Sequence, residues 1–185
     1  FTASTSTVNY TGTSAGVNIS AETYYNLGAG ITVDANTVTY TLAGNTTVGS
    51  VLTVGAATGA GTHSLDGSTR TLTLTATGTP FVINTQGTYT PSTSTVIYSG
   101  TSAPVSVAGT SYYNLEVGTT GDGNTVTYTL SADATVGRVL TIGAASGAGI
   151  HSLDGSTRTL TLSGTTGSPL AIGSQGAFTA SSSTV

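Results

Sequence analysis

The sequence predicts an all-β protein made of tandem repeats, with a parallel β-solenoid as the favoured architecture. Apolar residues alternate with Thr or Ser in short runs such as TLTLT, TVTYTL and VSVAG, which is typical of strands buried on one face. The same runs return about 88 residues later, and such a period indicates a repeat architecture. No window places apolar residues at helical spacing over three turns, so almost no helix is expected.

The composition supports strands rather than disorder. Gly, Thr and Ser make up about half of the 185 residues, but 37% of the chain is apolar, enough to build a thin core. Charged residues are only 5%, against about a quarter in an ordinary soluble domain. A surface with so few charges and so many hydroxyls leads us to expect an extracellular or cell-surface protein.

Charge and hydropathy exclude two classes of partner. The net charge is −4 and the three Arg residues are the only Lys or Arg, so no basic cluster exists for nucleic acid. No apolar run approaches the length needed to span a membrane. The chain has no Cys and can form no disulfide.

The chain divides into two full repeats and the start of a third. The predicted units are residues 1–87, 88–176 and 177–185. The opening motif FTASTSTV returns as YTPSTSTV and again as FTASSSTV, while HSLDGSTRTLTL is identical at 63–74 and 151–162. The offset is 88 residues up to the end of that motif and 89 residues beyond it. We therefore expect an array that continues in both directions.

Each repeat is predicted to supply about four coils of the solenoid. The second repeat separates at Gly or turn residues into the segments 88–111, 112–134, 135–155 and 156–176. Each segment carries a first strand with two apolar residues two apart: Val96/Tyr98, Leu115/Val117, Leu140/Ile142 and Leu160/Leu162. Three of them carry a second strand, at Val105/Val107, Val126/Tyr128/Leu130 and Leu170/Ile172. The stretch His151–Asp154 is a poor strand by this pattern.

Stacked coils would bury a column of Leu, Val and Ile and place ladders of Thr outside. A string of tandem immunoglobulin-like β-sandwich domains remains the alternative, because each repeat also has the length of such a domain and the same alternation. Gly at ten-residue intervals serves either the corners of a solenoid or the hairpins of a sandwich.

The repeat pattern resembles a known style of sequence. The motifs F/YTxSTSTVxYxG, YYNLxV, TVGxxLTIG and LTLSG are similar to the Thr/Ser/Gly-rich tandem β-repeats of large bacterial secreted and cell-surface proteins, which are fibre- or adhesin-like. The resemblance covers nearly the whole chain. It implies an extracellular location and a structural or adhesive role, and it brings no catalytic residues.

The motif HSLDGSTR is the strongest candidate for chemistry. Its ionisable residues are His63, Asp66 and Arg70 in the first repeat and His151, Asp154 and Arg158 in the second. A His and an Asp could bind a metal or exchange a proton. The interpretation we favour is a turn, because Asp-Gly suits positive backbone angles and Arg can pair with Asp at the surface. No third metal ligand is near in sequence.

The other acidic residues form no recognisable site. The acids are Glu22, Asp34, Asp66, Glu116, Asp122, Asp133 and Asp154, and no two lie close together on one strand face as a glycoside hydrolase would need. The loop GTTGDGN at 118–124 has one acid, and its counterpart at 28–36 reads GAGITVDAN, so we interpret it as a turn. We predict no catalytic, cofactor-binding or metal-binding residue and no cofactor.

Two further features bear on surface binding. The adjacent pairs Tyr24-Tyr25 and Tyr112-Tyr113 should place one ring inside and one outside on a strand, where the outer ring could stack on a sugar. Glycosylation sequons occur at Asn9, Asn18 and Asn45, but Ile97, Ser106 and Asp133 stand at the matching positions of the second repeat. That difference argues against a required glycan.

The sequence thus predicts a structural subunit of an extracellular filament or cell-surface stalk, without catalysis. Its expected partners are other copies of itself or adjoining repeats. An adhesin or glycan-binding surface repeat is the alternative. A more remote one is an ice-binding protein, since Thr residues two apart recur at 37–41, 71–75 and 125–129. An enzyme is the least favoured interpretation.

Overall fold

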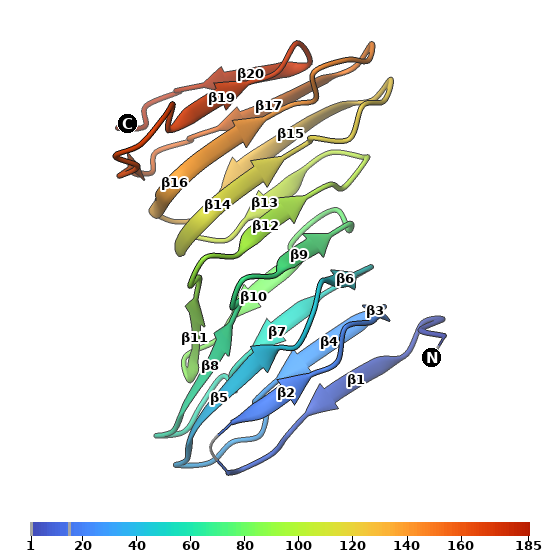
Figure 1. Ribbon diagram of the computed structural model, residues 1–185, viewed down its shortest axis with the longest axis vertical. Helices are drawn as coiled ribbons and strands as arrows, with labels where there is room; N and C mark the ends of the chain where they lie inside the picture. The colour runs from blue at the N-terminus through green and yellow to red at the C-terminus, as the bar shows by residue number, and fades with distance from the viewer. Residues whose placement is uncertain (1, 15) are drawn as a thin grey trace.

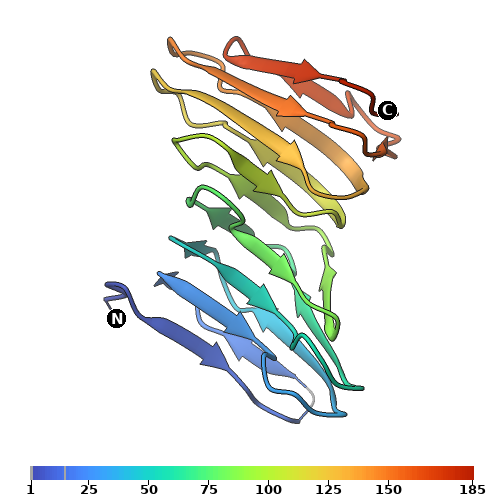
Figure 2. The same ribbon diagram turned by 180° about the vertical axis from the view of Figure 1, so that it is seen from behind.

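The alternating strands pair in parallel and wind into a β-solenoid of about seven turns, seen from two sides in Figure 1 and Figure 2. This computed structural model describes residues 2–14 and 16–185. Strands are the only regular elements across these residues, and every register between named strands is parallel, as in β5 (Thr37–Leu42) against β8 (Thr62–Asp66). The solenoid prediction is confirmed. The sandwich alternative is wrong, because a Greek-key sandwich requires antiparallel pairs.

Four sheets run along the stack, named A to D here. Sheet A contains β1 (Thr7–Tyr10), β4 (Asn26–Ala29), β7 (Leu52–Val54) and β10 (Phe81–Ile83). Sheet B contains β2 (Val17–Ile19), β5, β8 and β11 (Gly87–Thr90). Sheet C contains β3 (Thr23–Tyr24), β6 (Thr46–Val48), β9 (Thr71–Leu74), β12 (Thr95–Tyr98), β14 (Ser111–Val117), β16 (Ala134–Ile142), β18 (Leu160–Leu162) and β19 (Leu170–Ile172). Sheet D contains β13 (Val105–Val107), β15 (Thr125–Leu130), β17 (Ile150–Asp154) and β20 (Gly176–Thr179).

The core is the column of side chains enclosed between the sheets. In sheet B the inward positions form the file Val17, Tyr40, Leu65 and Tyr89, since each pairs with the next in the parallel register. Fully burying an aliphatic side chain of this size stabilises by about 1.5–3 kcal/mol. The outward positions between them form the file Thr39, Ser64 and Thr88. The predicted hydroxyl ladder is therefore present.

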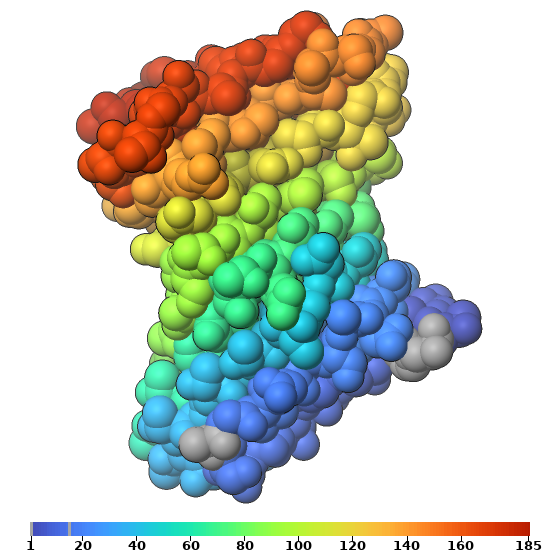
Figure 3. Space-filling model, viewed as in Figure 1, coloured from blue at the N-terminus to red at the C-terminus, as the bar shows by residue number. Residues whose placement is uncertain are grey.

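The coils follow each other in chain order. The colours of the space-filling view succeed one another along the long axis without mixing (Figure 3). Each coil thus packs mainly on the coils before and after it, as expected of a repeat protein. Stability then depends on nearest-neighbour contacts.

Two details differ from the sequence prediction. The stretch at His151–Asp154 forms a good strand, β17, although it carries a His where an apolar residue is expected. Leu170 and Ile172 are not the return strand of their coil, because β19 pairs with β16 in sheet C and β20 supplies the return strand. The predicted segment boundary after residue 176 cuts that strand after its first residue. Period-two alternation shows that a strand exists, but not which sheet receives it.

The stack steps sideways at the boundary between the repeats. In the first repeat a coil lays two short strands one after the other along one face, such as β6 followed by β7, and later β9 followed by β10. The first strand of the second repeat, β12, pairs with β9 rather than with β10. Sheets A and B therefore end at β10 and β11, and sheet C joins the two repeats.

Candidate functional site

The motif HSLDGSTR does not form the site that its composition allowed. Alternation along β8 turns His63 inward, where it is 1% exposed, and Asp66 outward. Asp66 Oδ1 accepts hydrogen bonds from the Ser68 amide at 2.8 Å and from Ser92 Oγ at 2.7 Å. The expected surface pair between Asp66 and Arg70 is wrong, because the ion pairs found over residues 2–14 and 16–185 are both His–Asp pairs elsewhere.

The turn itself is real but differs in detail. Gly67 has an ordinary backbone conformation, and it is Ser68 that takes a positive φ of 53°. Ser156 repeats this at 54°. The Asp side chain two residues before the Ser accepts the amide hydrogen and stabilises the strained residue, as in an Asx turn.

Each buried His instead meets an Asp from a distant loop. His63 Nε2 lies 3.2 Å from Asp34 Oδ1, and His151 Nε2 lies 3.1 Å from Asp122 Oδ1. The second contact is a hydrogen bond, whereas the first lacks hydrogen-bond geometry. The ring of His63 also packs beside Tyr40, with 6.0 Å between ring centroids. The pair thus ties the loop after β4 to the strand β8 one coil further on.

Two further groups hold each Asp. The Asn36 amide donates to Asp34 Oδ1 at 2.7 Å, and the Asn124 amide does the same for Asp122. This backbone hydrogen bond is the main reason that the pKa of each carboxyl lies below its ordinary value. A buried Gln then donates from Nε2 to the backbone carbonyl of the Asp: Gln86 to Asp34 at 2.7 Å, and Gln175 to Asp122 at 2.6 Å.

A glycine lets the loop approach the imidazole. Gly30 has a φ of 64° and its counterpart Gly118 a φ of 61°, both in the left-handed region. A Cβ on either residue would overlap the ring of His63 or His151. The cluster of Asp, His and Gln, which we call the Asp–His–Gln cluster, is therefore built into the coil by backbone that only glycine permits.

The cluster has the chemistry of a structural latch. Nδ1 of each His and Oε1 of each Gln are buried without a hydrogen-bond partner. No group of three or more His, Cys, Asp or Glu residues able to hold a metal occurs in the described part of the chain. One carboxylate, one imidazole and one amide can fix a loop by hydrogen bonds and charge, and their repetition in both repeats fits that role.

The sequence carried a signal for this cluster that we missed. The loops 28–36 and 118–124 have different sequences, GAGITVDAN and GTTGDGN. Their acidic residues Asp34 and Asp122 nevertheless stand 88 residues apart, at the repeat offset. Each is followed two residues later by Asn. A comparison restricted to polar residues at the repeat offset would have found the Asp–Asn pair beside the repeated His.

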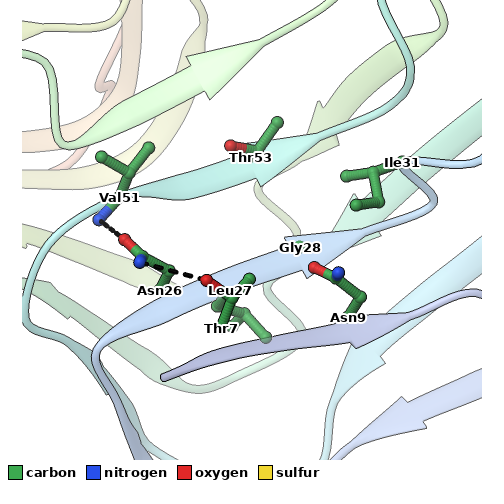
Figure 4. Close-up of a pocket in the computed structure, with 8 residues that line it drawn as sticks. All are labelled: Thr7, Asn9, Asn26, Leu27, Gly28, Ile31, Val51 and Thr53. Carbon is green, nitrogen blue, oxygen red and sulfur yellow. Dashed lines mark hydrogen bonds between the residues drawn. The ribbon is translucent and has the colours of Figure 1, made fainter. Parts of the chain in front are cut away.

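A hollow lies on the outer face of sheet A and is shown in Figure 4. It measures about 300 Å³ and is lined by Thr7, Asn9, Asn26, Leu27, Gly28, Ile31, Val51 and Thr53. Asn26 spans its floor, donating to Thr7 Oγ1 and accepting from the Val51 amide, both at 3.2 Å. Gly28 leaves room that Glu116 occupies at the matching position of the second repeat.

The other surface candidates take clear positions. Tyr24 and Tyr112 are buried, whereas Tyr25 is 37% exposed, as the in-and-out prediction requires. Arg138 lies over the neighbouring ring of Tyr113, 5.9 Å from its centroid. Asn45 is exposed, but its Oδ1 accepts from the Thr71 amide. Asp133 makes the same bond to Thr159 in the second repeat, so the sequon position has a structural role in both copies.

The junction between repeats is the second site that recurs. Ser92 Oγ donates to Asp66, and the Thr93 and Thr95 amides donate to the carbonyls of Ser68 and Arg70. The segment that begins the third copy repeats all three bonds: Ser181 to Asp154, Ser182 to Ser156 and Thr184 to Arg158. We call this set the junction clasp.

The clasp turns the motif HSLDGSTR into a docking element for the following repeat. Its half-buried Asp and its turn carbonyls are the groups that receive the following segment, STST at 92–95 and SSST at 181–184. The identity of the motif in the two repeats thus has a physical reason, which neither a metal site nor an isolated turn supplies.

Nothing in the described residues forms a helix of the length and hydropathy that membrane crossing requires. Comparison with known proteins found no match: no protein family, characterised protein or solved structure matches this chain.

Proposed function

We propose that this chain is a structural unit of an extracellular filament or cell-surface stalk, in which tandem repeats add length. The observation that carries the proposal is the junction clasp, because the same residues join repeat to repeat and receive the start of the next copy. A solenoid with such a junction can extend by the same step each time. The Thr- and Ser-rich outer face carries few charges, which favours association between neighbouring stacks.

The proposal is tested with chains carrying two, four and six copies of the repeat. Four coils at the strand spacing of about 4.8 Å should add roughly 19 Å of length per repeat, while the width stays constant. Small-angle X-ray scattering measures both dimensions. A maximum dimension that does not grow in proportion to the copy number would contradict a stalk.

The location is tested on the source cells. Antibodies raised against the repeat should label extended material on the outside of intact cells in immunogold electron micrographs. Label found only after the cells are opened would overturn the extracellular proposal.

Glycan binding is the second candidate, and the hollow on sheet A supports it. The hollow is open to solvent, and Asn9, Asn26 and Thr53 give it polar groups. Its lining residue Gly28 corresponds to Glu116 in the second repeat. It lacks an aromatic ring among its lining residues. A glycan array probed with the wild type and with Gly28→Glu separates the two: binding abolished by the substitution would favour an adhesin.

Ice binding rests on the hydroxyl file Thr39, Ser64 and Thr88. In the second repeat the file beside it contains Ile150, and Ala177 takes the place of Thr88. The regular array that ice would require is thus broken along the stack. A thermal-hysteresis measurement without activity removes this candidate.

A further inference from the structure

The aromatic ring that the lining of the sheet A hollow lacks stands directly beside it. Tyr25 lies in the break between β3 and β4 and is 37% exposed, while Tyr24 before it and Leu27 further on are buried. Tyr25 and Asn26 therefore both point away from the core, as two neighbouring residues do at a bulge. Since Asn26 lines the hollow, the ring of Tyr25 is at its edge.

The hollow lies on the side of the stack, within a paired sheet. β4 is paired with β1 on one side and with β7 on the other. Gly28 stands between Asn9 of β1 and Thr53 of β7 in these registers, so an amide and a hydroxyl flank the glycine (Figure 4). A Cβ on Gly28 would meet Asn9 Oδ1. The glycine thus leaves the amide of Asn9 open to a ligand.

The second repeat keeps the frame of this face. Four residues return unchanged at the 88-residue offset: Tyr25, Asn26, Val51 and Thr53 correspond to Tyr113, Asn114, Val139 and Thr141. The side-chain amide of Asn114 donates to Thr95 Oγ1 at 3.2 Å, as that of Asn26 does to Thr7. The two faces can therefore be compared residue by residue.

The ring is covered in the second repeat and uncovered in the first. Arg138 places its guanidinium carbon 5.9 Å from the centroid of the Tyr113 ring. The residue at the position of Arg138 in the first repeat is Ser50, which is too short to reach across Tyr25 in the same way. One substitution thus opens the face of the aromatic ring.

The hollow beside the ring differs in the same sense. Glu116 stands at the position of Gly28, and its carboxylate accepts a hydrogen bond from the Thr119 hydroxyl at 3.1 Å. Ile97 stands at the position of Asn9 and offers no hydrogen-bonding group in its side chain. All three differences between the repeats therefore open the first face or make it polar.

The groups on this face match an uncharged saccharide. No residue that lines the hollow is charged, so an ionic ligand would find no counter-charge there. The ring of Tyr25 offers an apolar surface for the C–H face of a sugar. An amide and a hydroxyl both donate and accept hydrogen bonds, as sugar hydroxyls do. The volume of about 300 Å³ is at the lower end of the range for small-molecule sites, which suits a short saccharide.

We propose that Tyr25 and the hollow of sheet A form a binding site for a short uncharged saccharide, open in the first repeat and closed in the second. The inference rests on glycan binding, the second candidate function. It adds the ligand class, the aromatic residue and the number of sites, which is one for each pair of repeats.

An array of neutral and sialylated oligosaccharides, followed by calorimetric titration of the best neutral ligand, tests the site. The wild type should bind a neutral saccharide with one site per chain. Tyr25→Ala and Ser50→Arg should each weaken binding by at least about tenfold, since one removes the ring and the other covers it. Tyr113→Ala makes the same change at the covered ring and should leave the Kd unchanged.

The reverse experiment opens the second face. The triple variant Ile97→Asn, Glu116→Gly, Arg138→Ser gives the second repeat the residues of the first, and the stoichiometry should rise from one site to two. Circular dichroism shows whether each variant is folded. A folded triple variant with a single site contradicts the assignment, as does equal weakening by Tyr25→Ala and Tyr113→Ala.

The proposals fail differently. If no neutral saccharide binds, both glycan binding and this site are overturned, while tandem chains that lengthen with copy number leave the stalk in place. Binding that Tyr25→Ala and Ser50→Arg do not weaken would overturn this site and leave glycan binding elsewhere on the molecule. Binding with the expected losses, in chains that fail to lengthen, would support the site and overturn the stalk.

Discussion

The junction between the repeats and the C-terminal end of the solenoid have nearly the same residues in different surroundings. At the junction, Leu74 and Tyr89 are buried under the next coil, whereas their counterparts Leu162 and Phe178 remain half-buried. The comparison shows that the following repeat completes the burial of the core at the boundary between the two repeats. The local sequence makes the strand, and the neighbour completes its burial.

The hydroxyl of Tyr89 marks a second difference. It lies 2.8 Å from Ser94 Oγ, while the counterpart Ser183 Oγ is buried without a partner, since Phe178 stands at the position of Tyr89. The Tyr89–Ser94 position has this hydrogen bond and the Phe178–Ser183 position lacks it, so each position serves as a control for the other. At each such pair, a substitution at one site can be measured against the same substitution at its counterpart.

Core truncation should separate the two regions most strongly. Leu74→Ala removes a fully buried side chain and should lower the free energy of unfolding by about 2–5 kcal/mol. Leu162→Ala at the C-terminal end should cost clearly less, because its side chain is already in partial contact with water. Urea unfolding followed by circular dichroism measures both. Equal losses would show that the next coil does not complete the core.

Alkaline pH should weaken the junction. Burial raises the pKa of Tyr89 to about 12, so the folded state stays protonated while the unfolded chain ionises near pH 10. The stabilisation is complete below about pH 10 and is lost as the pH rises toward 12, which amounts to about 2–3 kcal/mol. Burial also raises the pKa of Tyr98 and of Tyr112.

Ultraviolet absorbance of tyrosinate, followed with circular dichroism, should show most ionisation together with unfolding. Tyr89→Phe should reduce the loss of stability above about pH 10. A smooth titration of all tyrosines in a folded protein would contradict the buried junction.

Restoring the missing hydroxyl should strengthen the C-terminal end. Phe178→Tyr places a donor beside Ser183 Oγ, as Tyr89 does beside Ser94, and should raise stability by about 0.5–1.5 kcal/mol. The double variant Phe178→Tyr, Ser183→Ala is the control and should lose the gain. An equal thermal midpoint for both variants would show that the bond does not form.

Removing a carboxylate of the Asp–His–Gln cluster should have the smallest effect. The lowered pKa of Asp122 means that its stabilisation is present above about pH 4 and is lost as the pH falls through the folded-state value. Asp122→Asn should therefore lower the thermal midpoint at neutral pH and flatten its decline in acid. Asp133→Asn, which keeps an acceptor for Thr159 as Asn45 does for Thr71, is the control. If the thermal midpoints of Asp122→Asn and Asp133→Asn fell identically with decreasing pH, the stabilising role of the Asp–His–Gln cluster would be contradicted.

Much of the fold could be predicted from the sequence because its local and repeating patterns agree. Alternation in TVTYTL places Val38, Tyr40 and Leu42 on one side, and the same run at 125–130 behaves alike. The placement of β19 could not be predicted, because Leu170 and Ile172 would alternate equally well in either sheet. The site was predicted less well, since His63 meets Asp34 through the stacking of one coil on the next.

The all-β class, the repeat, the coil count and the inward and outward faces of most strands could be read from the sequence alone. These follow from backbone and side-chain geometry that a few neighbouring residues set. The tertiary structure alone decided the sideways step at β12, the Asp–His–Gln cluster and the junction clasp. Those features join residues about 24 or more positions apart, and their partners are selected by the register in which one coil packs on the previous one.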